Sequence, residues 1–559
     1  MRELVYLPLG GAGEIGMNMY LYGLGPEENR RWLIVDCGVT FGDMSSAPGV
    51  DLVLPDISYI EARRHAIDGI VITHAHEDHI GALGRYWKRL RAPVYCTAFT
   101  AEIAKRKLGE EGLPETNIKI VDPRQRMEIG AFDVEFFPMT HSIPDANAVV
   151  LRTPAGTVFH TGDFKFDHAP ALGAPTDAAA LKSLGDEGVD FLACDSTNVF
   201  EEGVAGSEED TRAGLAEAFQ EAEGAIAATS FASNIARLKT LGEIARENNR
   251  SVVIVGRAMR RMIETAVRSG KLTDFPETIS EDDAASLPTD HVCYLVTGSQ
   301  GEARAALSRI AMGTHPSVSL GEGDLVIYSS KTIPGNERDV HRIYNLLSER
   351  GVRVIDADMS DVHVSGHACR EELLALYRLL QPTYVIPLHG EHRHLVEHAR
   401  MAEDWGVADA IIAPNGTMVE LSAGGVSFTH EEVATGRVYL DGAAFVGAND
   451  GVIRRRLRLA RQGHVAIALV VDDEGELVAD PQVKCLGLPI APGDWPAPLE
   501  ELIAEAVEST VDRLEPRNRR TDGQVEDAVS AACRRICDRH WRKKPEVTVM
   551  VTRLEEAEQ

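Results

Sequence analysis

The chain has 559 residues, of which 44% are hydrophobic and 26% charged, as in ordinary soluble globular proteins of about two to four domains. A formal net charge of −29 argues against a protein that coats nucleic acid without selectivity, but it allows a nuclease whose positive charge is concentrated in one groove. No apolar run approaches the roughly 20 residues needed to span a bilayer, and the first residues lack the features of a signal peptide. Eight scattered cysteines without a CxxC pair are typical of buried thiols, so we expect a cytoplasmic protein.

The first predicted elements are strands that flank a glycine-rich turn at residues 10–16. These glycines lack the spacing of a nucleotide-binding loop, because residues 17–22 alternate in polarity like a strand instead of opening a helix. We interpret the segment as a hairpin turn near a site, with Asn18 as a polar contact. Asp36 ends the next apolar run, where it could support a metal ligand or cap the following loop.

The most informative stretch follows the apolar run at residues 70–72. His74, His76, Asp78 and His79 place four metal-binding side chains within six positions, at the end of a predicted buried strand. His74 and His76 can point to the same side, whereas Asp78 and His79 lie where the loop enters a helix. Borderline-soft cations such as zinc take this mixture of nitrogen and oxygen ligands. The pattern favours a metal site over a histidine-rich surface loop.

Later strands end in further candidate residues, namely His141, Asp163, Asp195 and His389. Each follows an apolar or aromatic run, as expected for a sheet whose edge carries the function. A single histidine at a strand end is more often structural, but the recurrence of suitable residue types outweighs that alternative. We interpret His160 and His168, which flank Asp163, as structural or supporting residues.

Between Asp195 and His389 the sequence changes character. Residues 208–222 predict an acidic helix. Three strand–loop–helix units follow, with strands at residues 226–229, 291–296 and 324–328. Strands that alternate with helices predict a parallel, Rossmann-like sheet. Small hydroxyl and glycine residues at the helix starts could bind phosphate, or they could simply cap the helices. Because this block separates ligands that must meet, we expect a domain inserted into the metal-binding one.

The chain returns to the predicted metal-binding domain near residues 362–368, and a helix at residues 370–380 leads to the His389 strand. A linker with few chemical signals is predicted at residues 431–460. The remaining hairpin, two helices and final strand predict a small α/β domain, at residues 463–490, 498–514, 523–540 and 546–551. Its basic runs could contact RNA, or they could be solvated faces or oligomer contacts, which we favour.

Seven metal-binding side chains divide into two sets around one shared carboxylate, Asp163. One set is His74, His76 and His141, and the other is Asp78, His79 and His389. We expect two ions roughly 3.5–4 Å apart, with a hydroxide between them as the nucleophile toward a phosphoryl or acyl centre. The residues alone leave the substrate class open.

Several motifs resemble those of known families. His74-Ala75-His76-Glu77-Asp78-His79, together with His141, Asp163 and His389, resembles the metallo-β-lactamase signature. Asp195, His367 and His389 resemble motifs A, B and C of the β-CASP branch, which processes nucleic acids. The segments at residues 10–18, 141–145 and 333–337 are similar to bacterial ribonuclease J. The resemblance covers about residues 1–455 and is less specific in the C-terminal domain.

The resemblance implies an α/β fold, namely a metallo-β-lactamase αββα sandwich with an inserted Rossmann-like β-CASP domain and a small C-terminal α/β domain. We expect the sandwich at residues 1–207 and 356–430, with the insert at residues 208–355. The linker at residues 431–460 then leads to a C-terminal domain at residues 461–559, which mediates oligomerisation in the family.

The resemblance also implies a dizinc ribonuclease that degrades and matures single-stranded RNA. Such enzymes are 5′→3′ exonucleases that prefer 5′-monophosphate ends and have some endonuclease activity, and they act in mRNA decay and rRNA maturation. Two Zn²⁺ per subunit are implied, with Mn²⁺ or Mg²⁺ as alternatives in activity. The implied partners are single-stranded RNA, further copies of the chain in a homodimer or homotetramer, and proteins of an RNA-degradation complex. Association with a membrane is not expected.

Individual roles carry over by motif. His367 would protonate the departing 3′ oxygen, Asp195 would orient or tune His367, and Asp78 would serve both as a metal ligand and in catalysis. The terminal phosphate would be held by Ser233, His363 and Ser365.

Three alternatives remain. A small-molecule metallohydrolase of the lactamase or glyoxalase II type needs the metal site but has no use for His367 or the insert. A DNA-directed β-CASP nuclease would use the same residues. An inactive RNA-binding scaffold subunit has no need of intact metal ligands.

Overall fold

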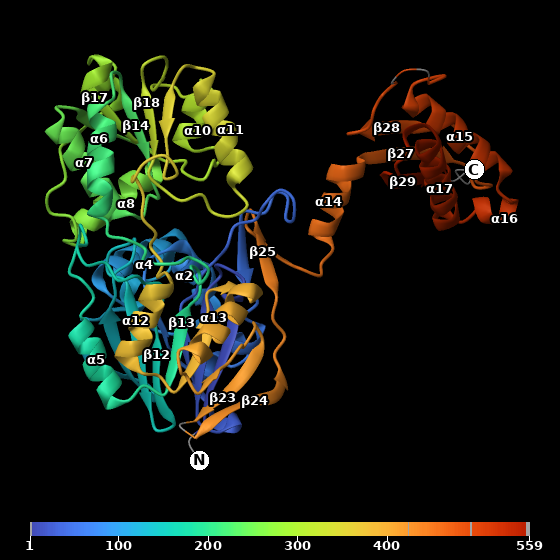
Figure 1. The fold of residues 1–559 in the computed structure, drawn as a ribbon. Helices are drawn as coiled ribbons and strands as arrows, with labels where there is room; N and C mark the ends of the chain where they lie inside the picture. Colours follow the sequence, from blue (N-terminus) through green and yellow to red (C-terminus); the bar gives the residue numbers. More distant parts are fainter. Residues whose placement is uncertain (1–2, 423, 492, 494, 555–559) are drawn as a thin grey trace. The chain divides into compact units, whose positions relative to one another are not determined.

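The computed structural model describes residues 3–422, 424–491, 493 and 495–554. The chain divides into two compact units, Met1–Thr40 with Leu54–Arg437 and Phe41–Val53 with Val438–Gln559. Within the described ranges, every helix is too short or too polar to cross a membrane. Figure 1 shows the first unit as a stack of sheets flanked by helices, and it shows the C-terminal helices and strands of the second unit.

Two sheets form the metal-binding part of the first unit. The eight-stranded sheet has the order β24 (Gly425–Glu432), β23 (Thr417–Ser422), β1 (Leu4–Gly10), β3 (Met19–Leu24), β4 (Arg31–Val35), β6 (Ile67–Val71), β7 (Val94–Cys96) and β8 (Ile118–Ile120). The seven-stranded sheet has the order β22 (Asp409–Ala410), β20 (Tyr384–Leu388), β13 (Phe191–Asp195), β12 (Gly156–His160), β11 (Asn147–Thr153), β10 (Phe132–Pro138) and β9 (Arg126–Ile129). Side chains from both sheets, such as Tyr22, Val71, Phe136 and Ala193, form one buried core between them.

Helices cover the outer faces of these sheets. The outer side of the seven-stranded sheet packs against α5 (Ala178–Glu187), α12 (Arg370–Leu380) and α13 (His392–Asp404). Beside the eight-stranded sheet, α3 (Leu83–Leu90) packs on α4 (Ala98–Glu110), which contacts β8. This layering confirms the predicted αββα sandwich, and α12 has the bounds that were expected for it.

The insert is built on a parallel sheet with the order β16 (Thr278–Ile279), β15 (Ser251–Val255), β17 (Val292–Val296), β14 (Ile226–Thr229), β18 (Leu325–Tyr328) and β19 (Arg353–Ile355). Side chains of α10 (Ala306–Ala311) and α11 (Glu337–Ser348) pack on one face of it. Figure 1 shows α6 (Asp210–Gln220) and α7 (Ile235–Glu247) on the other side. The inner strands β17 and β18 are continuously apolar and buried, as expected for strands with helices on both faces. The predicted Rossmann-like architecture is confirmed.

The sequence predicted three strand–loop–helix units in the insert, whereas the structure has a fourth. It consists of β15 and α8 (Arg257–Arg268), and β16 and β19 extend the sheet at its two edges. The run Ser251–Val255 has the apolar character of a buried parallel strand. Only Gly256 separates it from the helix, so the cluster of small polar residues that marked the other units is missing there.

The C-terminal part of the second unit is a three-stranded sheet covered by two helices. Its order is β28 (Gln482–Leu486), β27 (His464–Val471) and β29 (Glu546–Arg553). The helices α15 (Leu499–Arg513) and α17 (Asp522–Trp541) pack on one face, where Val465, Ile467 and Leu469 are buried. The alternating burial along β27 shows that the other face is more open. The small α/β domain predicted from the sequence is confirmed.

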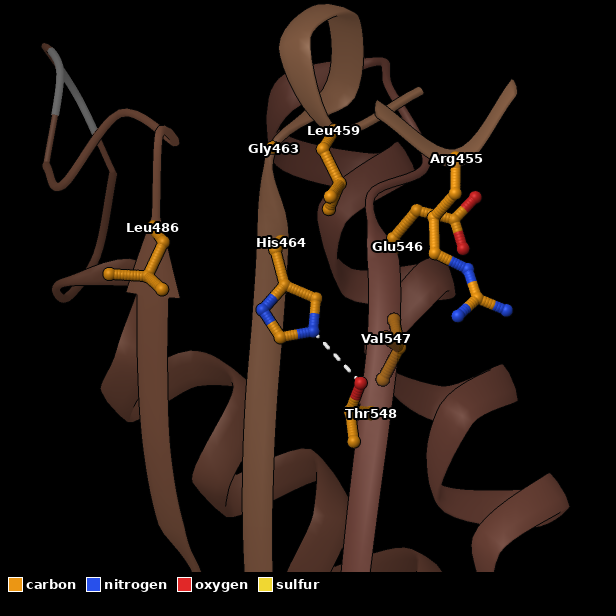
Figure 2. Close-up of a pocket in the computed structure, with 8 residues that line it drawn as sticks. All are labelled: Arg455, Leu459, Gly463, His464, Leu486, Glu546, Val547 and Thr548. Carbon is orange, nitrogen blue, oxygen red and sulfur yellow. Dashed lines mark hydrogen bonds between the residues drawn. The ribbon is translucent and has the colours of Figure 1, made fainter. Parts of the chain in front are cut away.

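The segment predicted as a linker at residues 431–460 contains regular structure. It holds a hairpin of β25 (Arg437–Asp441) and β26 (Ala444–Gly447), followed by α14 (Val452–Gln462). Ile453 is the one buried residue described in α14, and most of the other residues of this helix are exposed. A pocket of about 510 Å³ lies between α14 and the sheet (Figure 2), where His464 Nε2 and Thr548 Oγ1 form a hydrogen bond of 2.9 Å.

Candidate metal centre and active site

Loops at the ends of four strands bring the predicted ligands together. His74, His76, Asp78 and His79 follow β6, and His141, Asp163 and His389 follow β10, β12 and β20. Since β12, β13 and β20 are parallel neighbours, the side chains at their carboxyl ends meet at one edge of the sheet. The seven side chains form two groups whose ligand atoms lie within 4.8 Å of one another, and Asp163 belongs to both.

The first group consists of three imidazoles and Asp163. His76 Nδ1 lies 3.1 Å from His74 Nε2 and 3.1 Å from His141 Nε2. Asp163 Oδ2 lies 3.5 Å from His74 Nε2 and 3.7 Å from His141 Nε2. Ligands about 2.0–2.1 Å from a tetrahedral zinc ion are separated by about 3.3 Å, so these spacings fit such an ion.

Burial keeps these three imidazoles neutral. It lowers the pKa of His76 to about 4 and lowers the pKa of His74 and His141 well below the usual value, in spite of the nearby Asp163. A neutral imidazole has a lone pair for a cation, and His⁺ does not. The protonation state of the group therefore suits metal binding.

The second group joins two carboxylates and two imidazoles. His79 Nε2 lies 3.1 Å from Asp163 Oδ2 and 3.5 Å from Asp78 Oδ2, and His389 Nε2 lies 3.0 Å from Asp78 Oδ2. Burial lowers the pKa of His389, but Asp163 and hydrogen bonds to Asp195 and Asp78 outweigh burial and raise it to about 10. A cation that binds here would therefore displace a proton from this imidazole. Asp163 Oδ1 is buried and has no hydrogen-bond partner among the described residues. A bound cation would satisfy this oxygen, so the donor set fits a second ion.

Each imidazole has a partner for the nitrogen that faces away from its group. These partners are Thr73 Oγ1 for His74 at 3.0 Å, Ser233 Oγ for His76 at 3.1 Å, Asp36 Oδ2 for His79 at 2.7 Å, the Gly366 carbonyl for His141 at 2.6 Å and Thr197 Oγ1 for His389 at 2.6 Å. Such partners fix the tautomer and the orientation of a metal-binding histidine. The carboxylate of Asp36 also accepts a hydrogen bond from the Thr73 backbone N–H at 2.8 Å, so it both supports His79 and holds the loop.

The backbone around the centre is tightly constrained. Asp36 and His389 have φ values of +64° and +52°, in the left-handed region that residues with a side chain seldom adopt. A Cβ at Gly38 would lie 1.7 Å from the Asp78 carbonyl oxygen, so only glycine allows this approach. Asn18 Nδ2 lies 3.2 Å from Asp78 Oδ2, which places the glycine-rich turn beside the site as predicted.

Beside the two groups lies a carboxylate–imidazole pair. His367 Nδ1 and Asp195 Oδ2 are 2.7 Å apart, and Asp195 Oδ1 accepts hydrogen bonds from the backbone and side chain of Thr197. Burial lowers the pKa of His367, but Asp195 and Asp163 outweigh it and the net shift is upward. The His367 side chain is 22% exposed, whereas that of Asp195 is 2% exposed, so the imidazole is the member that a substrate can reach.

The three residues predicted to hold a phosphate lie on two segments, Ser233 on one and His363 and Ser365 on the other. Ser233 follows β14 in the insert and contacts His76. Ser365 Oγ accepts hydrogen bonds from Asn198 Nδ2 at 2.8 Å and from the His367 N–H at 3.2 Å. His363 Nδ1 is buried without a hydrogen-bond partner in the described chain. Burial, with Arg237, Lys165 and Lys331 nearby, lowers the pKa of His363 to about 3. Three cations therefore lie around this imidazole, and each is paired with a carboxylate, namely Glu208, Asp167 and Glu201.

Several residues at the site were not singled out from the sequence. Thr197 and Asn198 directly follow Asp195, and their polarity in that motif was a usable signal. The Gly366 carbonyl had no signal, because every residue has a backbone carbonyl. Of the two flanking histidines, His160 is buried and bonded to the Tyr22 hydroxyl at 3.1 Å, and His168 is exposed.

Four family descriptions match consecutive parts of the chain. They are the metallo-beta-lactamase superfamily over residues 13–213, the ribonuclease J beta-CASP domain over 223–347, the Zn-dependent metallo-hydrolase RNA specificity domain over 352–413 and the ribonuclease J C-terminal domain over 451–554. A crystal structure of a protein of unknown function from Enterococcus faecalis superposes with a TM-score of 0.50 at 18% identity, over 75% of this chain and 100% of that one. This likeness concerns the fold alone.

Similar proteins extend over nearly the whole chain. Ribonuclease J of Sinorhizobium meliloti is 40% identical over 99% of this chain and 98% of its own length. Ribonuclease J of Mycolicibacterium smegmatis is 42% identical over 83% and 82%, and that of Corynebacterium glutamicum is 36% identical over 96% and 74%. The fold, the family matches and these identities agree, and the chain belongs to the ribonuclease J family.

Proposed function

We propose that the protein is a ribonuclease that degrades and matures single-stranded RNA, acting as a 5′→3′ exonuclease with some endonuclease activity and a preference for 5′-monophosphate ends. Family membership makes the protein a metal-dependent nuclease. The observation that carries the finer proposal is the Asp195–His367 pair, 2.7 Å apart beside two groups of metal ligands. A small-molecule metallohydrolase has no use for such a pair.

The metal ligands, Asp195 and His367 have different roles in the proposed reaction. Two Zn²⁺, or Mn²⁺ or Mg²⁺ in their place, would be held by His74, His76, Asp78, His79, His141, Asp163 and His389, and when bound they supply a nucleophile and neutralise phosphoryl charge. Asp195 holds Nδ1 of His367, which leaves Nε2 to give a proton to the departing 3′ oxygen. The upward shift of the His367 pKa favours the protonated form that this role requires.

Recognition of the RNA end is assigned to the junction of the insert and the sandwich. Ser233 comes from the insert, while His363 and Ser365 lie on the segment that returns from it. Their hydroxyl and imidazole groups can donate hydrogen bonds to a terminal phosphate, and the positive charge of Lys165, Lys331 and Arg237 lies close to His363. A pocket at this junction would measure the 5′ end while the metal centre cleaves the bond.

A substrate panel tests the activity. Zinc-loaded protein is incubated with a 5′-phosphorylated RNA, a DNA of the same sequence and a lactam. We expect mononucleotides released from the RNA and little turnover of the other two. Faster cleavage of the DNA would favour the DNA-directed alternative, lactam hydrolysis would favour a small-molecule enzyme, and no turnover of any substrate would favour a scaffold subunit.

The end preference is tested with three RNAs that differ only in the 5′ group. We expect the highest kcat/KM for the monophosphate, because a pocket that fits one phosphate excludes the bulk and charge of a triphosphate. The hydroxyl form lacks the charge-assisted hydrogen bonds to the pocket and should bind more weakly. Equal rates for monophosphate and triphosphate RNA would contradict the proposal that a pocket selects a single 5′ phosphate.

The resemblance to the same family also suggests where the enzyme acts, how it assembles and in which processes. We propose a cytoplasmic homodimer or homotetramer that acts in mRNA decay and rRNA maturation with partners in an RNA-degradation complex. The C-terminal domain at residues 461–559 would mediate assembly, and the more open face of its sheet supports this role. The insert at residues 208–355 and the sandwich at residues 1–207 and 356–430 would together enclose the RNA.

A further inference from the structure

One imidazole of the metal centre is oriented differently from the others. His74, His79 and His141 direct Nε2 into the cluster, whereas His76 directs Nδ1 inward, 3.1 Å from both His74 Nε2 and His141 Nε2. Its Nε2 therefore points outward. A neutral imidazole carries one proton, so Nδ1 is free to bind an ion only if that proton is on Nε2.

The partner of His76 Nε2 comes from the insert. Ser233 Oγ lies 3.1 Å away, across 157 positions of the sequence. The partners of the other four imidazoles are Thr73, Asp36, Gly366 and Thr197, all outside the residues expected to form the insert. Among these five partners, Ser233 is the one that belongs to the insert.

A rigid scaffold holds this hydroxyl in place. The next residue, Asn234, caps α7 by accepting a hydrogen bond from the Arg237 N–H at 3.0 Å. The buried side chains of Arg237 and Glu208 form an ion pair at 2.9 Å, and Asn234 Nδ2 donates to Glu208 at 3.3 Å. The Arg237 guanidinium also donates to the Val362 carbonyl at 2.7 Å. These contacts therefore hold together three segments: the start of the insert at Glu208, the segment that leaves it at Val362, and the loop that carries Ser233.

We propose that Ser233 is a positioning residue for the metal centre: its hydroxyl accepts the Nε2–H of His76 and so presents Nδ1 to the ion. This inference rests on the proposed two-metal centre and goes beyond the phosphate-binding role assigned to Ser233. A hydroxyl can accept one hydrogen bond while it donates another, so Ser233 can hold His76 and contact a terminal phosphate together. The end-recognition pocket and the metal centre then share one side chain.

Zinc affinity tests the proposal without using nuclease activity. The dissociation constants of both ions are measured by competition with a chromophoric chelator for the wild type, Ser233→Ala, Ser233→Thr and Ser230→Ala. Ser230 is a matched control, because it lies three positions away in the same loop and its buried hydroxyl has no hydrogen-bond partner among the described residues. Thermal unfolding of the metal-free proteins checks that each variant is folded.

We expect Ser233→Ala to weaken one of the two zinc sites by about 10–100-fold, as loss of such a partner does at other metal sites. Ser233→Thr keeps the hydroxyl and should stay within about threefold of the wild type, as should Ser230→Ala. Unchanged affinity in Ser233→Ala, or equal losses in the Ala and Thr variants, would overturn the proposal. If the wild type binds zinc in this way but cleaves no RNA, the proposed function is wrong and the inference about Ser233 is still supported. If the wild type binds no zinc, both are wrong.

Discussion

Two buried clusters of charged side chains in the first unit differ in how their charges are balanced. In the Arg237–Glu208 pair one positive and one negative charge balance each other. The guanidinium donates to Glu208, to the Ser329 carbonyl and hydroxyl, and to the Val362 carbonyl. Its Nη2 lies 2.9 Å from Glu208 but forms no hydrogen bond with the described residues. The metal centre instead brings together ligand atoms that carry lone pairs. His76 Nδ1 lies 3.1 Å from His74 Nε2 and 3.1 Å from His141 Nε2, and Asp163 Oδ1 is buried without a hydrogen-bond partner among the described residues.

The difference separates a structural cluster from a ligand site. A buried ion pair balances its own charge, although its net contribution to stability is small. A cluster of imidazole and carboxylate lone pairs that face one another is stabilised when a cation binds among them. The arrangement of the charges, an internal pair in one cluster and converging lone pairs in the other, therefore distinguishes the two.

The largest effect is expected when the carboxylate that both ligand groups share, Asp163, is removed. We expect Asp163→Asn to lose most bound zinc and all measurable nuclease activity, because one residue contributes to both ligand groups. Elemental analysis after dialysis measures the metal. Asp177→Asn is the matched control: Asp177 caps α5, and its replacement should leave the zinc content unchanged. Full zinc occupancy in Asp163→Asn would contradict the assignment.

The next effect concerns His367, which lies at the margin of the metal centre. We expect His367→Ala to lower kcat by about 10²–10⁴-fold, the typical cost of losing a general acid, while both ions stay bound. Asp163, Asp195, His367 and His389 also lie close enough together to hold a metal, so zinc must be counted alongside turnover. Loss of a full metal equivalent in this variant would make His367 a ligand instead.

The last effects concern the stability of the Arg237–Glu208 pair and not turnover. Arg237→Met leaves Glu208 buried and unpaired and should destabilise the protein by about 3–5 kcal/mol, whereas the double variant Arg237→Met/Glu208→Leu should recover much of that loss. Arg212→Met removes a more exposed pair with Glu243 and should cost less than about 1 kcal/mol.

Chemical denaturation measures all three variants. If the double variant were as unstable as Arg237→Met, the cluster would owe its stability to the remaining hydrogen bonds and not to charge pairing.

Much of the fold and of the candidate site could be predicted because both leave local signals. Strand ends that carry His141, Asp163, Asp195 and His389 stand out in the sequence, and the structure brings these side chains together. The continuous apolar strands of the insert and the alternating strand β27 are equally local. Periodicity of this kind follows from one face or two faces being buried.

What could not be predicted depends on how distant segments pack. The hydrogen bond between Ser233 and His76 spans 157 positions, and no local pattern marks either residue for the other. Arg237 reads as one of many helix arginines, yet it is fully buried because Glu208 and Val362 meet it there. Helix α14 was not predicted, because a run dominated by arginines was interpreted as a basic part of a linker, although Ile453, Leu457 and Ala460 recur at helical spacing in it.

The most direct test of the two-metal centre is a crystal structure of the zinc-loaded protein with anomalous diffraction measured at the zinc edge. We expect two peaks separated by roughly 3.5–4 Å. One should be bound by His74, His76 and His141, the other by Asp78, His79 and His389, with Asp163 between them. A single peak, or zinc bound away from Asp163, would contradict the account.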